Sequence, residues 1–130
     1  MNFSVKVITS IAILVALIVG ISIVTQNILY KTAGDLEEYI TKAENSAKSG
    51  EWSAALQSVQ QIQNKWSKIK GIWAILIDHQ EIDNIDVTLA RMQKFIQCRD
   101  TSSALAEASA LLKFIGHIPK KETLLLENIL

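Results

Sequence analysis

The chain has 130 residues, of which 49% are hydrophobic and 20% charged, values close to those of an ordinary globular domain. Up to Tyr30 the one charged side chain is Lys6, and the remainder carries 12 basic and 13 acidic residues, a net charge of −1. This balance argues against a DNA-binding domain, and we expect no nucleic-acid partner. A single cysteine, Cys98, excludes an internal disulfide framework and a cysteine-based zinc site. One proline and five glycines exclude a turn-rich β-sandwich.

The first 30 residues are dominated by an apolar run. Residues 7–24 carry no charge, and Phe3 and Tyr30 place aromatic side chains at its two ends. At about 1.5 Å per residue, a helix between these aromatics is about 40 Å long, enough for a bilayer with its headgroups. A cleaved signal peptide is the alternative, but its apolar region is normally shorter, about 7 to 15 residues, and ends at a small-residue cleavage site. We predict an uncleaved signal anchor over residues 1–30 that contacts the lipid bilayer through residues 5–28.

The charges that flank this run indicate its orientation only weakly. The amino terminus and Lys6 lie on one side, and Lys31 and Lys42 lie on the other, so the positive-inside count is nearly equal. A short N-terminal tail ordinarily stays in the cytoplasm. The prediction is a single-pass protein of the cell membrane with residues 31–130 as an extracytoplasmic soluble domain.

Beyond the anchor, apolar residues recur every three or four positions, the spacing of one face of an α-helix. Residues 48–51 interrupt the first stripe, where Gly50 suits a left-handed helix C-cap. Asp100 can cap a fourth helix. Residues 116–119 are expected to end that helix, and residues 120–130 to add a short fifth one. The predicted fold is all-α: a transmembrane helix, then an antiparallel bundle of about four helices in two hairpins, with a short C-terminal helix. The predicted stripes contain Leu36, Ile40, Ala43, Ala47, Ala55, Leu56, Val59, Ile62, Trp66, Ile69, Trp73, Leu76, Ile82, Ile85, Leu89, Met92, Ile96, Leu105, Ala108, Leu111, Leu112 and Ile115.

The two predicted hairpins share one phase. Apolar positions of the first recur 49 residues later in the second, as in Leu36 with Ile85 and Ile62 with Leu111. A tandem duplication of a helical hairpin explains this, as in tetratricopeptide-like arrays. Two heptad-like hairpins of equal length explain it equally, since 49 is seven heptads. A compact antiparallel bundle is favoured over an open solenoid, which needs at least three repeats.

The densest polar segment contains two overlapping patterns. On a helix, His79, Asp83 and Asp86 fall at i, i+4 and i+7 on one face, and an imidazole with two carboxylates suits a divalent cation. Asp78 followed by Glu81 has the spacing of a capping box, and acidic residues in a first turn are stabilised by the helix dipole. We favour the helix start, with a partner surface and a metal site as the alternatives.

The tryptophans and the second histidine have both structural and functional interpretations. Trp66 and Trp73 lie seven residues apart on one stripe, which predicts core packing, whereas Trp52 follows a turn where it can be exposed. His117 lies at the expected end of the fourth helix, where histidine commonly contacts the last carbonyls. A functional pairing of His117 with His79 is the alternative, because an antiparallel bundle brings those two helix ends together.

Other polar features point to no reaction. Lys65, Lys68 and Lys70 are interpreted as a solvated helix face, and Cys98, with no base near it in sequence, as an inert thiol. The sequence holds no glycine-rich phosphate loop, nucleophile elbow or zincin pattern. We therefore expect no enzyme, no catalytic residue and no cofactor.

Two segments resemble a known family. Leu76-Ile77-Asp78-His79-Gln80-Glu81-Ile82-Asp83-Asn84-Ile85, and His117-Ile118-Pro119-Lys120-Lys121-Glu122 with Asn128-Ile129-Leu130, are similar to an uncharacterised Firmicute family, domain of unknown function 4363. The resemblance implies a short single-anchor protein with a helical domain, and it suggests a membrane protein as partner. Gln80 stands where the family's pattern has an acid, which weakens the metal interpretation. The resemblance implies no activity.

These observations predict a membrane-anchored helical interaction module, an accessory or scaffolding subunit of a membrane protein complex. Its expected partner is another membrane protein or a second copy of the chain. The expected interaction surface consists of Asp78, His79, Glu81 and Trp52. The alternative is an extracytoplasmic domain that senses a ligand or divalent cation through His79, Asp83 and Asp86, with His117 as a further candidate.

Overall fold

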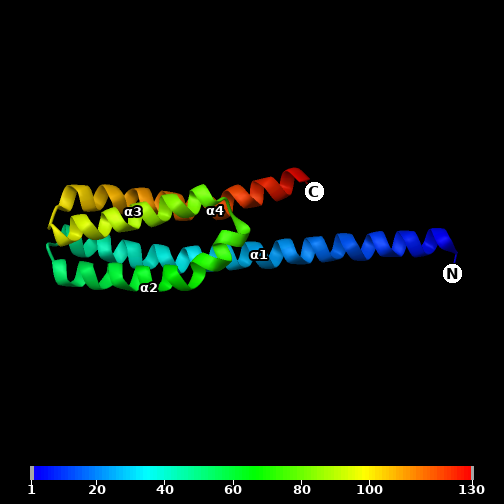
Figure 1. Ribbon diagram of the computed structural model, residues 1–130, viewed down its shortest axis with the longest axis horizontal. Helices are drawn as coiled ribbons and strands as arrows, with labels where there is room; N and C mark the ends of the chain where they lie inside the picture. The colour runs from blue at the N-terminus through cyan, green and yellow to red at the C-terminus, as the bar shows by residue number, and fades with distance from the viewer. Residues whose placement is uncertain (1, 130) are drawn as a thin grey trace.

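The computed structural model describes residues 2–129, and this part of the chain is folded into four α-helices (Figure 1). They are α1 (Phe3–Lys48), α2 (Trp52–Leu76), α3 (His79–Gln97) and α4 (Thr101–Ile129). Within the described residues there is no strand, so the predicted all-α fold is confirmed.

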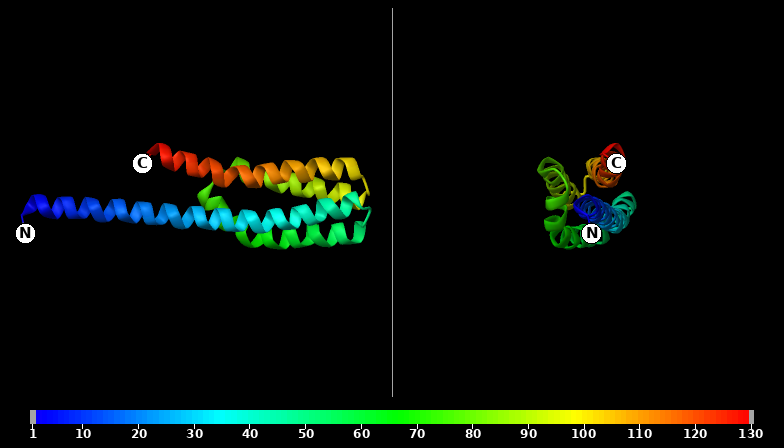
Figure 2. Two further views of the ribbon diagram at one scale, coloured as in Figure 1. Left: turned by 180° about the vertical axis from the view of Figure 1, so that it is seen from behind. Right: turned by 90° about the vertical axis from the view of Figure 1, so that its right-hand side faces the viewer.

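The helices form an antiparallel bundle. α1 packs against α2 and α4, and α3 packs against the same two helices, so that α1 and α3 lie on one diagonal. The end-on view of Figure 2 shows this arrangement, and both figures show α1 continuing far beyond the bundle. We call the end where α1 continues the proximal end, which also holds the α2–α3 connection. The distal end holds the two turns at residues 49–51 and 98–100.

α1 joins the apolar run to the bundle without a break. Its 46 residues make a helix about 69 Å long, and no cap or turn marks the boundary that we predicted at residues 30 and 31. What changes along the helix is its surroundings. The most apolar 18-residue stretch contains no buried residue, whereas from Leu29 onward one side of the helix is buried. By length and composition this is the one described helix that is able to cross a membrane.

α4 does not end where the sequence predicted. The expected stop at residues 116–119 and the separate fifth helix are both wrong, because α4 continues through Pro119 to Ile129. A proline inside a helix removes one backbone hydrogen bond and costs about 3 kcal/mol. Burial of Ile115, Ile118 and Pro119 against the bundle offsets that cost. Tertiary packing therefore overrides the local stop signal.

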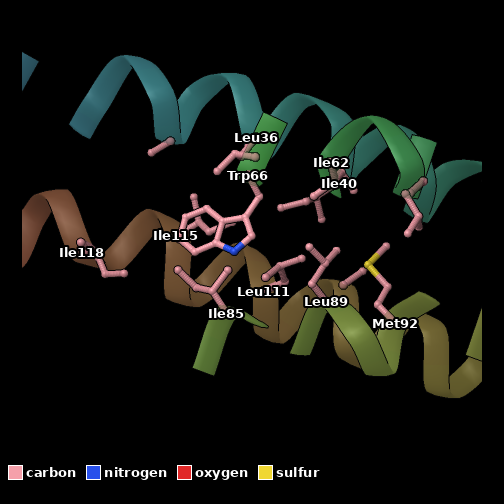
Figure 3. Packing of buried hydrophobic residues seen from close by; sticks show 14 of the residues in the cluster. Leu36, Ile40, Ile62, Trp66, Ile85, Leu89, Met92, Leu111, Ile115 and Ile118 are labelled. Carbon is pink, nitrogen blue, oxygen red and sulfur yellow. The ribbon is translucent and has the colours of Figure 1, made fainter. Parts of the chain in front are cut away.

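The core follows the predicted stripes. Figure 3 shows the Trp66 indole of α2 pointing between the other helices, toward Ile85 of α3 and Ile115 of α4. Leu56, which we had placed in the stripe, is instead exposed. Among the described side chains, the buried hydrophobic residues are Leu29, Ala33, Leu36, Ile40, Ala43, Ala47, Ala55, Val59, Ile62, Trp66, Trp73, Ile77, Ile82, Ile85, Leu89, Met92, Ile96, Ala104, Ala108, Leu111, Ile115 and Ile118.

The two hairpins turn in the same way, 49 residues apart. Gly50 and Arg99 both have the left-handed backbone, with φ of 73° and 56°. The N–H of Glu51 donates to the Ser46 carbonyl at 2.9 Å, and the N–H 49 residues later makes the matching bond, also at 2.9 Å. These bonds define a Schellman motif at the end of each first helix. The 49-residue spacing of the apolar stripes is therefore matched by two turns of the same geometry.

Arg99 occupies a backbone position that favours glycine. An L-residue in the left-handed region costs about 1 to 2 kcal/mol, partly offset by the greater freedom that glycine gives the unfolded chain. Arg99→Gly is expected to raise the free energy of unfolding by about 0.5 to 1 kcal/mol, and Gly50→Ala to lower it by about 1 kcal/mol. Denaturant unfolding of the full chain in detergent, followed by circular dichroism, measures both. Equal stability of the two variants would contradict the Schellman assignment.

Candidate functional site

The start of α3 is built as a helix N-terminus. Asp78 has extended backbone, and its Oδ1 accepts a hydrogen bond from the N–H of Gln80 at 2.9 Å. Glu81 lies in the first turn, and its Oε1 is 3.5 Å from Nζ of Lys121 on α4. The predicted cap at Asp78 is confirmed, while Glu81 ties α3 to α4.

The candidate metal ligands do not converge. Asp86 accepts a hydrogen bond from Nε1 of Trp66 at 2.7 Å, and its other oxygen pairs with the ammonium of Lys70. His79 and Asp83 are exposed on the same helix. Among the side chains that the structure describes, those of residues 2–122 and of Asn128, no group of three from His, Cys, Asp or Glu lies close enough to hold a metal ion. The carboxylate of Asp86 therefore serves the α2–α3 contact.

His117 and His79 are both exposed, on α4 and α3. The ion pair of Arg91 with Glu107, at 3.0 Å, aligns these antiparallel helices, and it puts His79 level with residue 119 of α4, about 3 Å along the axis from His117. The two histidines thus lie at the same end of the bundle. The prediction that α4 ends near His117 is wrong, because the helix continues to Ile129.

The two buried tryptophans form a contact that links three helices. Their rings meet edge to face, with centroids 5.5 Å apart. Nε1 of Trp73 donates to Oγ1 of Thr32 on α1 at 2.8 Å, and Trp66 reaches Asp86 on α3. The predicted core placement of both tryptophans is confirmed. The polar partner on α1, Thr32, had no signal in the sequence, because helical spacing does not show which helix faces which.

The lysines of α2 are less solvated than predicted. Lys70 pairs with Asp86, and Nζ of Lys65 lies 2.8 Å from Oδ2 of Asp35 on α1. The interpretation as a purely solvated face holds for Lys68, which is exposed. Two of the three lysines thus bridge α2 to its neighbours, although such partly exposed pairs contribute at most about 1 kcal/mol each.

The distal end carries an open hollow of about 450 Å³ between the two turns. It is lined by Trp52, half-buried, and by Arg99, with Gly50, Glu51, Ser53 and Ala54. Asp100 caps α4 beside it, and the hydrogen bonds from Ser103 hold the pKa of that carboxyl below its ordinary value. Sequence reasoning singled out Trp52. It missed Arg99 because the two residues meet only when both turns lie at one end of the bundle.

The interaction surface expected from the sequence is divided between the two ends of the molecule. Asp78, His79 and Glu81 lie at the proximal end, and Trp52 at the distal end. The 25 residues of α2 separate them by about 37 Å. The structure therefore offers two separate surfaces.

This architecture defines an antiparallel four-helix bundle whose first helix is extended by an exposed apolar half. The chain belongs to the family described as Domain of unknown function (DUF4363), whose family model matches residues 23–129. The matched segment begins near the end of the apolar run and includes the whole bundle, and it confirms the resemblance seen in the sequence. No curated protein and no solved structure matches the chain.

Trp66 is expected to contribute to stability in two separable ways. Trp66→Ala leaves a cavity in the core and is expected to lower the free energy of unfolding by about 3 to 5 kcal/mol. Trp66→Phe keeps most of the ring but removes the hydrogen bond to Asp86, and a loss of about 1 to 2 kcal/mol is expected. Denaturant unfolding in detergent measures both. A Trp66→Ala variant as stable as the wild type would contradict the core placement.

Asp78 is expected to act through its cap. Asp78→Ala removes the acceptor for the N–H of Gln80 and is expected to destabilise the isolated protein by about 1 kcal/mol. Asp78→Asn is the matched control, because asparagine caps a helix about as well as aspartate does. Unchanged melting temperatures for both variants would show that the side chain has no capping role.

Proposed function

We propose that the protein is a membrane-anchored helical interaction module, an accessory subunit whose bundle binds a membrane protein partner on the extracytoplasmic side. The observation that carries the proposal is the continuity of α1, which runs as one helix from Phe3 to Lys48. A continuous helix holds the bundle at a fixed distance from the apolar half, measured along the helix axis. That arrangement suits a protein that presents a surface rather than one that encloses a substrate.

The anchor in this proposal is the apolar half of α1. Its most apolar window has no buried residue, so the bundle does not use this face. Exposed apolar side chains in such number are costly in water and favourable in lipid. Tyr30 then lies at the headgroup level, where tyrosine is enriched.

The distal hollow is the surface that we propose for the partner. From Tyr30 to Lys48 α1 rises about 27 Å, so the hollow lies well outside the bilayer. Tryptophan and arginine are the residue types most enriched at energetically important positions of protein interfaces, and Trp52 and Arg99 lie together here. The cation-sensing alternative lacks comparable support, because Asp86 is already bonded to Trp66 and Lys70.

Site-directed photo-crosslinking in the native membrane tests this proposal. A photo-crosslinking residue at Ser53, which lines the hollow, is expected to capture one dominant membrane protein. The same residue at Gln60, exposed two turns further along α2, is the matched control and is expected to capture it much less. The partner is identified by mass spectrometry, and a chain reduced to residues 1–34 controls for contacts of the anchor.

Arg99→Gly separates binding from folding, because this change is expected to stabilise the turn while it removes the guanidinium. Loss of the Ser53 crosslink in this variant supports the hollow as the binding surface. Crosslinks only between copies of the chain, or equal capture from Ser53 and Gln60, would contradict the proposal of an accessory subunit.

A further inference from the structure

The last turns of α2 expose apolar side chains at the proximal end of the bundle. Ile75 is 85% exposed and Ile72 is 46% exposed. Among residues 31–122, whose side chains the structure describes, Ile75 is the most exposed large hydrophobic residue. The packing of the bundle gives no reason for two isoleucines at these positions, because neighbouring residues of α2 already fill the core.

A hydrogen bond fixes the height of these isoleucines along α1. Nε1 of Trp73 donates to Oγ1 of Thr32, so these two residues lie level on the antiparallel helices α2 and α1. Ile75 is two residues further along α2, about 3 Å nearer the apolar half of α1, which places it level with Tyr30. Figures 1 and 2 show the α2–α3 connection at the end from which the apolar half of α1 extends.

The outward face of α2 changes from charged to apolar in the same direction. Lys68, Ile72 and Ile75 follow at i, i+4 and i+7 and share one side of the helix. Lys68 is exposed and lies about 10 Å from Ile75 along the axis, on the side away from the apolar run. Helices that enter a lipid interface have apolar side chains on the membrane side and lysines further out, where the ammonium groups reach the lipid phosphates. The end of α2 has the same arrangement.

We propose that the end of α2 inserts Ile72 and Ile75 into the headgroup region of the bilayer that α1 spans, as a second membrane contact of the bundle. The inference rests on the proposed anchor, since the height of Ile75 is set relative to Tyr30. We favour phospholipid over a protein as the contact of Ile72 and Ile75, because these side chains lie at the level where the apolar half of α1 ends. One helix alone leaves the bundle free to rotate about the membrane normal and to tilt, and a second contact to one side restrains the tilt.

Depth-dependent fluorescence quenching tests the insertion. The full chain in a Cys98→Ser background is reconstituted into phosphatidylcholine–phosphatidylglycerol vesicles with a nitroxide on a fraction of the headgroups. A fluorophore is attached in separate variants at Ile75→Cys and at Val87→Cys. Val87 is the matched control, because it is also an exposed aliphatic residue but lies eight residues, about 12 Å, above the start of α3. We expect severalfold stronger quenching for Ile75→Cys than for Val87→Cys.

A third label, at Asn27→Cys on α1, separates the two proposals. Strong quenching at Asn27→Cys with equal, weak quenching at Ile75→Cys and Val87→Cys would leave the anchor in place and overturn the insertion of α2. Weak quenching at Asn27→Cys would overturn the anchor and the insertion together. Protection of Ile75→Cys by contact between copies of the chain would also give weak quenching and would overturn the insertion.

Discussion

The continuity of α1 is the constraint on which the rest of the structure depends. One helix is exposed and apolar over its first half and buried on one side from Leu29 onward. Because the helix does not end between these halves, the other three helices pack around a continuation of the apolar helix. The position of each bundle residue along the axis of α1 therefore also gives its distance from the apolar half.

Side chains that join neighbouring helices hold this alignment. Trp73 bonds to Thr32 across α1 and α2, and Trp66 bonds to Asp86 across α2 and α3. The Glu81 and Lys121 pair then links α3 to α4 at the same end. Hydrophobic stripes alone leave helices free to slide by a turn, and these polar contacts favour the observed alignment.

The sequence was informative wherever the signal was local or periodic. Spacing of three and four placed Leu36, Trp66 and Trp73 in the core, and the glycine at position 50 placed the first turn. Spacing failed where contacts between helices decide the outcome. Pro119 is a strong local stop, yet its burial keeps α4 continuous.

The candidate site was predicted only in part for the same reason. Asp86 is predicted on the same helix face as His79. Its carboxylate instead contacts α2, where it accepts a hydrogen bond from Trp66 and pairs with Lys70. Arg99 has no such signal in the sequence, because it lies beside Trp52 only through the placement of both turns at one end of the bundle. The proposed roles of the distal hollow and of Ile75 thus both depend on which residues of different helices lie at the same position along the bundle axis.

A shared helix also fixes the angular phase between its two halves. Each residue of an α-helix advances the chain by about 100° and 1.5 Å. One residue added or removed between Val24 and Leu29 would turn every side chain of the apolar half by more than a quarter of a circle relative to the bundle. Conversely, a twist applied to the apolar half in the membrane would be transmitted through α1 to the distal turns, since no loop in between absorbs it. A continuous α1 thus fixes the rotation of the bundle about the helix axis relative to the apolar half, in addition to its distance from that half.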